Sequence, residues 1–407
     1  MQGIAETIPD YPFDRPALVP PPILDEIRTE EPFKKVRLWD GSVAWLVSRQ
    51  EDFRAVLADN SFSVNPLIPG FPNVSEARES LMVNEKPTFI RLDPPDHTLL
   101  RRMLSREFTQ SKINQYRPMV QTVVDDLIEK MLQKGPPADL YHDFALPIPS
   151  IVISHILGVP YEDHGFFQDR GSKKLAFNAH PDVPVEAAAE MRDYIDQLIS
   201  KKERKPGDDL LSRLVDEQIR PGQLPRDEAV RMAELLLIAG HETTANMIAL
   251  GTLSLLLDRA QFDYLREDPG LSPRAVEEML RFHSIVQYGL SRVATEDVEI
   301  NGHQIRKGEG VISLINAANW DPSVHPKPEY FDVRKKRTMH VAFGFGIHQC
   351  LGQPLARLEM DVVFSTLTQR LPTLDLAIAP GAIEYKRKAL VYGVEALPVT
   401  WSQEAAR

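Results

Sequence analysis

The chain of 407 residues contains a single cysteine, Cys350. One cysteine cannot form an intramolecular disulfide, and it cannot supply a multi-cysteine zinc or iron–sulfur site. A disulfide-stapled secreted scaffold and a cluster-binding protein are therefore excluded. A lone cysteine is most often a small buried hydrophobic side chain, so the residues around it decide between a structural and a chemical role.

Basic stretches, long apolar runs and leader segments are also scarce. The net charge is −11, which argues against nucleic acid as a partner. The most apolar run, Leu235-Leu-Leu-Ile-Ala-Gly, meets His241 and Glu242 too soon for a membrane span. The first ten residues lack the basic region and apolar core of a signal peptide or anchor. We therefore expect a soluble, cytoplasmic protein with no membrane contact.

Linkers, repeats and low-complexity segments are absent, so we expect a single domain over residues 1–407, with an extended proline-rich lead-in at 1–22. Helical apolar periodicity is clearest at 119–134, 227–258, 273–283 and 354–371. Short runs typical of strands occur at 35–39, 43–48, 297–300, 311–315 and near 391–399. The sequence predicts a mostly α fold with small peripheral β-sheets and one long central helix.

The lone cysteine lies in the segment Phe343-Gly-Phe-Gly-Ile-His-Gln-Cys-Leu-Gly352. Its glycines allow tight turns and close approach of the backbone to a ligand. An amphipathic helix pattern follows directly, and a thiol just before a helix N-terminus is favoured as thiolate by the dipole and the free N–H donors. A thiolate in such a loop can serve as the axial ligand of a haem iron.

The same segment resembles the haem-binding loop of the cytochrome P450 family, Phe-Gly-x-Gly-x-His-x-Cys-x-Gly. All six fixed positions match: Phe343, Gly344, Gly346, His348, Cys350 and Gly352. The resemblance implies the single-domain cytochrome P450 fold and a bound haem b with Cys350 as the iron ligand. It also implies a haem pocket that includes Phe343, Ala239 and Gly240. Stretches such as 144–150 and 346–353 are similar to the actinobacterial branch that hydroxylates macrolides, sterol-like molecules and xenobiotics.

The centre of the long predicted helix reads Ala239-Gly-His-Glu-Thr-Thr244. Glycine and paired threonines are weak helix formers, and their hydroxyls can bond back to carbonyls and loosen the helix. The motif resembles the family's Ala-Gly-x-Asp/Glu-Thr, which implies proton supply by Glu242 and positioning by Thr243. The alternative is a solvated acid and a capping threonine. A zinc site of the His-Glu-x-x-His type is excluded because Ala245 replaces the second histidine.

His97 and Arg101 lie in the stretch Asp93-Pro-Pro-Asp-His-Thr-Leu-Leu-Arg-Arg102. They are four residues apart and therefore share one helix face. They could form a plain surface pair. The resemblance instead implies that they grip the haem propionates together with Arg292 and His348, because charge-assisted hydrogen bonds suit carboxylates.

The segment Glu278-Met-Leu-Arg281 matches the family's Glu-x-x-Arg and places both side chains on one helix face. The resemblance implies a buried ion pair that braces the cysteine loop and is completed by a later arginine. At that position this chain has Lys335. Arg334 or Arg337 could take the place with a shifted backbone, or Lys335 could serve with fewer donors.

Fewer than sixty residues follow the cysteine loop, so we expect no built-in flavin, nicotinamide or iron–sulfur module. The resemblance implies a monomer that receives electrons from a separate ferredoxin and its reductase. Candidate docking residues are Arg102, Arg106, Lys335, Lys336, Arg337 and Arg357. A small lipophilic substrate and O₂ are expected in an apolar pocket lined by Val83, Phe89, Ile238, Ala239, Ile285, Val286 and Leu290.

The leading hypothesis is therefore a haem-thiolate monooxygenase that inserts one oxygen atom of O₂ into a lipophilic substrate by hydroxylation or epoxidation. A second hypothesis keeps the fold but assigns nitric oxide reduction or peroxide-driven oxidation. A third is a non-catalytic haem-binding sensor or carrier. The acid–alcohol pair Glu242–Thr243 favours the first.

Overall fold

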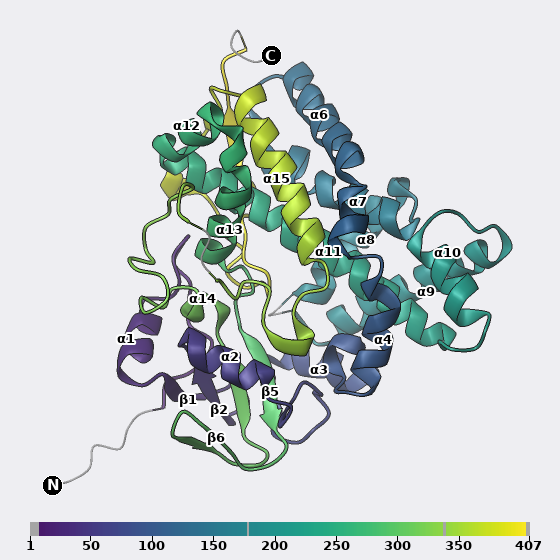
Figure 1. Cartoon of the computed structure of the whole chain (residues 1–407), viewed down its shortest axis with the longest axis vertical. Coiled ribbons are helices and arrows are strands. Elements are labelled where there is room, and N and C mark those ends of the chain that lie inside the picture. The colour runs from purple at the N-terminus through teal and green to yellow at the C-terminus, as the bar shows by residue number, and fades with distance from the viewer. Residues whose placement is uncertain (1–7, 177–178, 337–338, 404–407) are drawn as a thin grey trace.

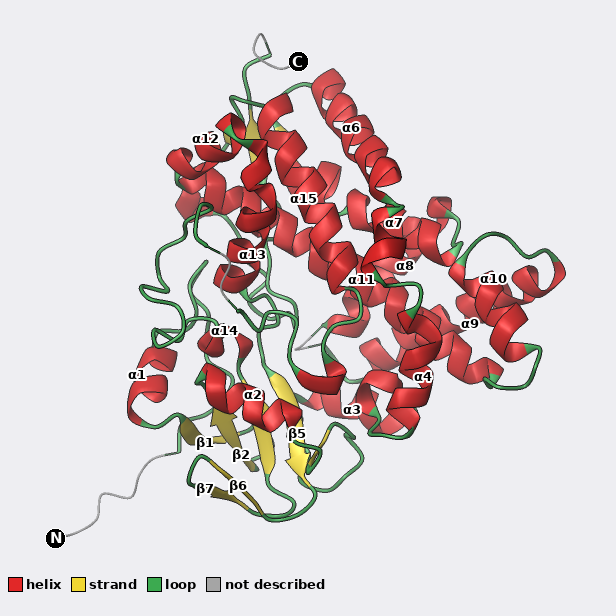
Figure 2. Cartoon of the chain, viewed as in Figure 1, coloured by secondary structure: helices red, strands yellow, loops and turns green. Residues whose placement is uncertain are grey.

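The computed structural model describes residues 8–176, 179–336 and 339–403. Helices fill most of the molecule, most strands gather at one end, and one small sheet lies at the opposite end near the C-terminus (Figures 1 and 2). The helices are α1 (Ile23–Glu30), α2 (Gln50–Ala58), α3 (Glu76–Asn84), α4 (Asp96–Ser105), α5 (Gln110–Asn114), α6 (Arg117–Lys134), α7 (Pro147–Leu157), α8 (His164–Leu175), α9 (Asp182–Arg204), α10 (Leu210–Leu214), α11 (Arg226–Leu257), α12 (Arg259–Glu267), α13 (Ser272–His283), α14 (Ile315–Ala318) and α15 (Gln353–Arg370). The predicted mostly α fold is confirmed, and the predicted helical ranges agree within two residues at each end.

The strands form three small sheets. The largest has the order β1-β2-β8-β5-β3, in which β2 and β8 are parallel and the other neighbours are antiparallel. The second has the order β4-β10-β9, and the third pairs β6 with β7. Their bounds are β1 (Phe33–Arg37), β2 (Val43–Val47), β3 (Phe62–Ser63), β4 (Ala138–Asp139), β5 (Leu290–Ala294), β6 (Val298–Ile300), β7 (His303–Ile305), β8 (Gly310–Ser313), β9 (Asp375–Leu376) and β10 (Pro398–Thr400).

The helix α11 crosses the interior and packs against α7, α9, α13 and α15 (Figure 1). It is buried on nearly all sides, as expected for a helix that is apolar around its whole circumference. The loosening predicted near residue 240 is not seen, because the helix is continuous from Arg226 to Leu257. Gly240 serves packing instead: a Cβ there would lie 2.7 Å from Cγ1 of Ile153, so glycine lets α7 approach.

The described part of the proline-rich lead-in is tied to the body of the protein. Arg15 is buried and donates hydrogen bonds to the carbonyls of Leu18 and His283, each at 2.8 Å. Its guanidinium lies 4.1 Å from the ring centroid of Tyr392. The segment therefore joins elements far apart in the sequence. Among the described residues, no helix combines the length and apolarity needed to cross a bilayer.

Candidate functional site

The cysteine loop is a tightly turned segment between α2 and α15. The Cys350 N–H donates to the carbonyl of Phe343 at 2.9 Å and so closes the loop. Gly346 has φ +72°, and a Cβ at that position would lie 2.3 Å from the Leu57 carbonyl oxygen. Only glycine therefore fits where the loop meets the end of α2.

The Cys350 side chain is accessible because it faces a cavity. Burial raises the pKa of the thiol, although the N–H groups of Gly352 and Gln353 and the charge of Arg101 act in the opposite direction. The predicted donors at the helix N-terminus are present, but desolvation outweighs them. A bound metal ion would reverse this balance, since a coordinating thiol gives up its proton.

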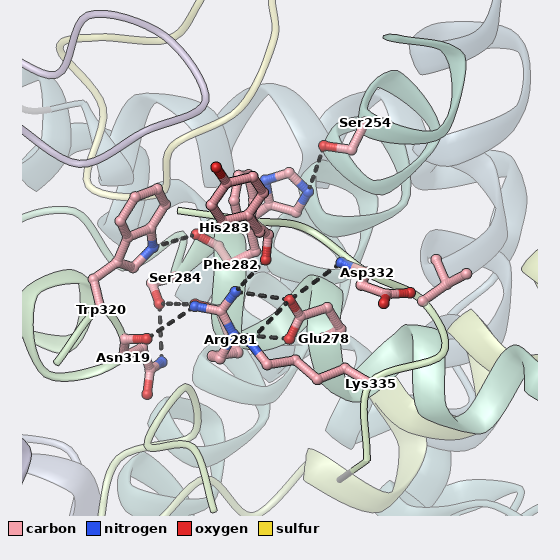
Figure 3. Close-up of polar contacts among 12 residues, drawn as sticks. Ser254, Glu278, Arg281, Phe282, His283, Ser284, Asn319, Trp320, Asp332 and Lys335 are labelled. Atoms are coloured by element: carbon pink, nitrogen blue, oxygen red, sulfur yellow. Dashed lines mark hydrogen bonds and ion pairs between the residues drawn. The ribbon is translucent and has the colours of Figure 1, made fainter. Parts of the chain in front are cut away.

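The predicted pair Glu278–Arg281 is formed and almost fully buried (Figure 3). Arg281 Nε donates to Glu278 Oε2 at 2.8 Å, and Arg281 Nη2 donates to Oε1 at 2.7 Å. Arg281 Nη1 also donates to the Asn319 carbonyl at 3.1 Å, and Asn319 Oδ1 accepts from the Val341 N–H at 2.7 Å. The ion pair is thus linked through Asn319 to the start of the cysteine loop.

Among the described residues, the third member of this network is Lys335, whose Nζ lies 3.7 Å from Glu278 Oε1 (Figure 3). Arg334 instead pairs with Asp332 at 3.2 Å and is about half exposed. Arg337, the other alternative, lies outside the described residues.

A second brace, which the sequence analysis missed, involves Glu277. Its carboxylate accepts from His340 Nε2 at 3.0 Å and from Arg357 Nε at 2.6 Å. Burial raises the pKa of Glu277, but the hydrogen bonds and charges of His340 and Arg357 outweigh it and lower that pKa to about 2. The Arg357 guanidinium also lies 4.6 Å from the ring centroid of Phe343. No sequence signal marks Glu277 apart from its place beside Glu278.

A mostly apolar cavity lies between the cysteine loop and α11. From α11 it is lined by Ala239, Gly240, Thr243 and Thr244, and from the loop by Phe343, His348 and Cys350. Four arginines also line it, Arg78, Arg91, Arg101 and Arg292. Among the described residues, no aspartate or glutamate does so.

Cationic and imidazole groups gather on one side of this cavity. His97 is fully buried, and neither of its ring nitrogens has a hydrogen-bond partner within the described part of the chain. Its ring lies 4.1 Å from that of His348. Burial, followed by the charge of Arg292 and neighbouring basic groups, lowers the pKa of His348 to about 3. Burial, followed by the charge of Arg91, lowers the pKa of Arg292 to about 9.

The acid that acts on this cluster is Asp93, which is already held by the Ser63 hydroxyl and by the Val64 N–H at 3.1 Å. Buried cations require a counter-ion, and buried imidazole nitrogens require hydrogen-bond partners. The described residues do not supply them to this cluster. The donor set therefore fits a cofactor with carboxylates, as haem has. Arg91 belongs to this group and was missed, although it stands only six residues before His97.

Glu242 and Thr243 are neighbours on α11 but face different surroundings. Thr243 lines the cavity, and its hydroxyl donates to the Ala239 carbonyl at 2.8 Å. Glu242 does not line the cavity; its Oε1 lies 3.1 Å from Lys386 Nζ. Burial raises the pKa of Glu242, but the Lys386 charge and further hydrogen bonds outweigh it and lower that pKa. The carboxylate is therefore ionised. Lys386 Nζ also donates a hydrogen bond of 2.6 Å to the Tyr141 hydroxyl, so it links Glu242 to Tyr141.

A further buried acid, Glu359 on α15, was also missed. Within the described residues, neither of its carboxyl oxygens has a hydrogen-bond partner of good geometry. Burial raises its pKa to about 8, and only the hydroxyl of Thr244 acts in the opposite direction. A glutamate inside the apolar pattern of 354–371 is the signal that could have marked it.

Five of the predicted pocket residues line the cavity: Phe89, Ala239, Ile285, Val286 and Leu290. Two do not. Val83 is 59% exposed, and Ile238 is buried in the core away from the lining. Met82, next to Val83, and Leu235, one turn before Ile238, line the cavity. Val83 was assigned to the wrong side of α3, since one step along an α-helix turns the side chain by about 100°.

Arg337 of the predicted docking residues lies outside the described part of the chain, and the other five divide into two groups. Arg102, Arg106 and Lys336 are exposed, and Arg106 is paired with Glu217. Lys335 and Arg357 instead belong to the internal ion pairs with Glu278 and Glu277.

Comparison with known proteins gives consistent matches. The family model "Cytochrome P450" matches residues 271–374. "Cytochrome P450-SU2" of Streptomyces griseolus is 45% identical over 98% of this chain and 96% of its own length. "Pentalenic acid synthase" of Streptomyces avermitilis is 44% identical over 96% of this chain and 97% of its own. The crystal structure of the mycinamicin VIII C21 methyl hydroxylase MycCI from Micromonospora griseorubida superposes with a TM-score of 0.92 at 39% identity, covering 97% of this chain and all of that chain.

Proposed function

Because this chain belongs to the cytochrome P450 family and is a haem-binding monooxygenase, we propose that it inserts one oxygen atom of O₂ into a bulky lipophilic substrate held between α11 and the cysteine loop. The observation that carries the proposal is the accessible Cys350 thiol in an apolar cavity whose basic residues lack carboxylate partners.

Haem b supplies the iron that binds and activates O₂ in this family. Cys350 would ligate that iron. The propionates would be held by Arg91, His97, Arg101, Arg292 and His348. Glu277, Glu278 and Arg281 would fix the loop that carries the thiol, so that its position does not depend on the cofactor alone.

The residues proposed to supply and position protons lie on α11. The Thr243 hydroxyl donates to the Ala239 carbonyl, so its oxygen is left to accept a hydrogen bond from the cavity side. The ionised Glu242, with Lys386 and Tyr141, forms a polar chain behind the cavity wall. These positions support proton supply through Glu242 and positioning by Thr243.

The apolar lining supports a lipophilic substrate. Relatives carry names that refer to varied bulky molecules, among them "Vitamin D3 dihydroxylase" and "20-oxo-5-O-mycaminosyltylactone 23-monooxygenase". The same proposal includes a single functional domain, a monomeric state and the cytoplasm as the compartment. It also includes a separate ferredoxin and its reductase as the source of electrons.

The first test is the spectrum of the reduced carbon monoxide complex. Thiolate ligation gives a strongly red-shifted Soret band, and Cys350→Ala should abolish it. A wild-type spectrum without that band would contradict the assignment of Cys350. Turnover with ferredoxin, reductase and isotopically labelled O₂ should then place one labelled oxygen atom in the product. Incorporation from water instead would overturn monooxygenation.

A further inference from the structure

The cavity contains more positive charge than the cofactor requires. Its four arginines face no lining carboxylate in the described chain, although the protein as a whole carries a net charge of −11. A haem brings two carboxylates. Arg91, Arg101 and Arg292 all lie close enough to His348 to lower its pKa, so these three arginines surround the two histidines.

Arg78 stands apart from that group. It comes from α3, and it is not among the groups that act on His97, Arg292 or His348. The charges that act on Arg78 are those of Arg91 and Glu85. Arg78 is therefore within electrostatic reach of Arg91, and it does not contribute to the pKa shifts of the histidine pair.

The Arg78 guanidinium has no hydrogen bond or ion pair with any described residue. Glu85, the acid that stabilises its charge, is already paired with Arg192 and lies 3.5 Å from Lys174. Burial lowers the pKa of Arg78 to about 10, so the group is charged at neutral pH. Arg78 is partly buried and lines the cavity, so its charge is partly removed from water but can be reached by a ligand there. An anion in the cavity would supply the counter-charge that the described residues do not.

The cavity wall that includes Arg78 is mostly apolar. Met82 lies one turn after Arg78 on α3, and Phe71, Phe89 and Ile90 line the same cavity. A ligand that fits this arrangement has a hydrophobic body and one anionic group. The planar fork of a guanidinium matches a carboxylate through two parallel hydrogen bonds.

We propose that Arg78 binds a carboxylate of the substrate, and that this enzyme oxidises lipophilic carboxylic acids. The inference rests on the proposed function, since it specifies the substrate class of the same cavity. Arg78 is then a specificity-determining residue, whereas Arg91, Arg101 and Arg292 serve the cofactor.

The test uses purified haem-loaded enzyme and pairs of a carboxylic acid with its own methyl ester. Suitable probes are saturated fatty acids, abietic acid and lithocholic acid, each with its ester, above pH 7 where the acids are ionised. Displacement of the water on ferric iron shifts the Soret band and gives a dissociation constant. For at least one pair, the acid should bind on the order of 10-fold or more tightly than its ester, as expected for hydrogen bonds to a charged group.

Arg78→Gln should weaken binding of that acid by the same factor and leave the ester unchanged, while Arg78→Lys should retain part of the preference. Met82→Ala is the matched control, because it changes the same helix and the same cavity but should affect acid and ester alike. The haem content of Arg78→Gln should equal that of the wild type.

Two results would overturn the inference: no acid in the set binds more tightly than its ester, or Arg78→Gln loses haem and leaves the acid preference intact. Both leave the red-shifted carbon monoxide band in place, so the proposed function would stand. Absence of that band would instead remove the proposed function itself.

Discussion

The charged residues beneath the cysteine loop are paired within the protein, whereas the described charged residues that line the cavity are not. Beneath the cysteine loop, the buried acids Glu277 and Glu278 each meet basic partners supplied by the protein, at distances down to 2.6 Å. Within the described cavity lining, the basic residues Arg78, Arg91 and Arg292 meet no carboxylate. The protein completes its own ion pairs where a loop must be fixed, and leaves cations unpaired where a ligand brings the anion.

The largest expected effect comes from breaking a completed pair. Arg281→Ala removes both charge-assisted bonds to Glu278. Its buried carboxylate then keeps only distant contacts among the described residues, with Lys335 Nζ at 3.7 Å and the Asp332 N–H at 3.5 Å. Loss of one partner of a buried pair costs about 3–5 kcal/mol. We expect a large drop in thermal stability and in haem content, measured by thermal unfolding and by absorbance.

Arg334→Ala is the control for this prediction. Arg334 is about half exposed and pairs with Asp332 on the surface, so its loss should change the stability much less than the loss of Arg281. Equal destabilisation by the two variants would mean that the Glu278 network does not brace the loop.

The next effect concerns Glu242. Glu242→Gln removes the charge that Lys386 stabilises but keeps the side-chain size, and it should lower ferredoxin-driven turnover on the order of 100-fold, as for loss of a proton-transfer group. Hydrogen peroxide supplies oxygen, electrons and protons together, so peroxide-driven turnover should persist. Steady-state assays with both oxidants measure the difference.

Glu234→Gln provides a matched variant on the same helix. Glu234 is buried and pairs with Lys174 at 2.5 Å, but it does not belong to the chain through Lys386 and Tyr141. Its substitution should change stability while turnover per folded molecule stays near the wild-type value. A similar loss of turnover in both variants would contradict a specific role for Glu242.

Local sequence patterns identified one side of the cavity better than the other. The cysteine loop and the Glu278–Arg281 pair follow short motifs, so the sequence alone indicates them. The cavity wall is assembled from segments that are distant in the sequence. The sequence did not show which side of its helix faces the cavity, so Val83 and Ile238 were wrongly predicted to line it. Arg91 and Glu359 were missed because their importance comes from burial without a partner, which depends on what packs around them in three dimensions.

A smaller effect should appear as pH dependence from Glu359. Burial raises its folded-state pKa from 4.5 to about 8, so between these values the folded protein holds a proton that the unfolded chain has lost. Stability due to this group therefore falls as pH rises through that window. Glu359→Gln cannot ionise, and its stability relative to the wild type should rise by up to about 1.4 kcal/mol per pH unit.

The measurement is thermal unfolding of wild type and variant from pH 5 to pH 8. Asp361→Asn serves as the control on the same helix, because that carboxylate is already paired with Arg117 at 2.6 Å. It should give no such upward slope. A constant difference between Glu359→Gln and wild type would show that Glu359 is charged in the folded protein and that an unobserved partner compensates it.

The smallest effect tests whether exposed cations on the cysteine side attract the electron donor. Lys335 is engaged with Glu278, so the charge reversals that isolate docking are Lys336→Glu and Arg102→Glu. Each should slow ferredoxin-driven turnover by about 10-fold or less at low salt, with a smaller difference at high salt. Lys205→Glu, an exposed lysine after α9, should leave the rate unchanged. If all three variants behave alike, the exposed charges of the cysteine side act only as solvated surface, and unpaired cations have a ligand role only inside the cavity.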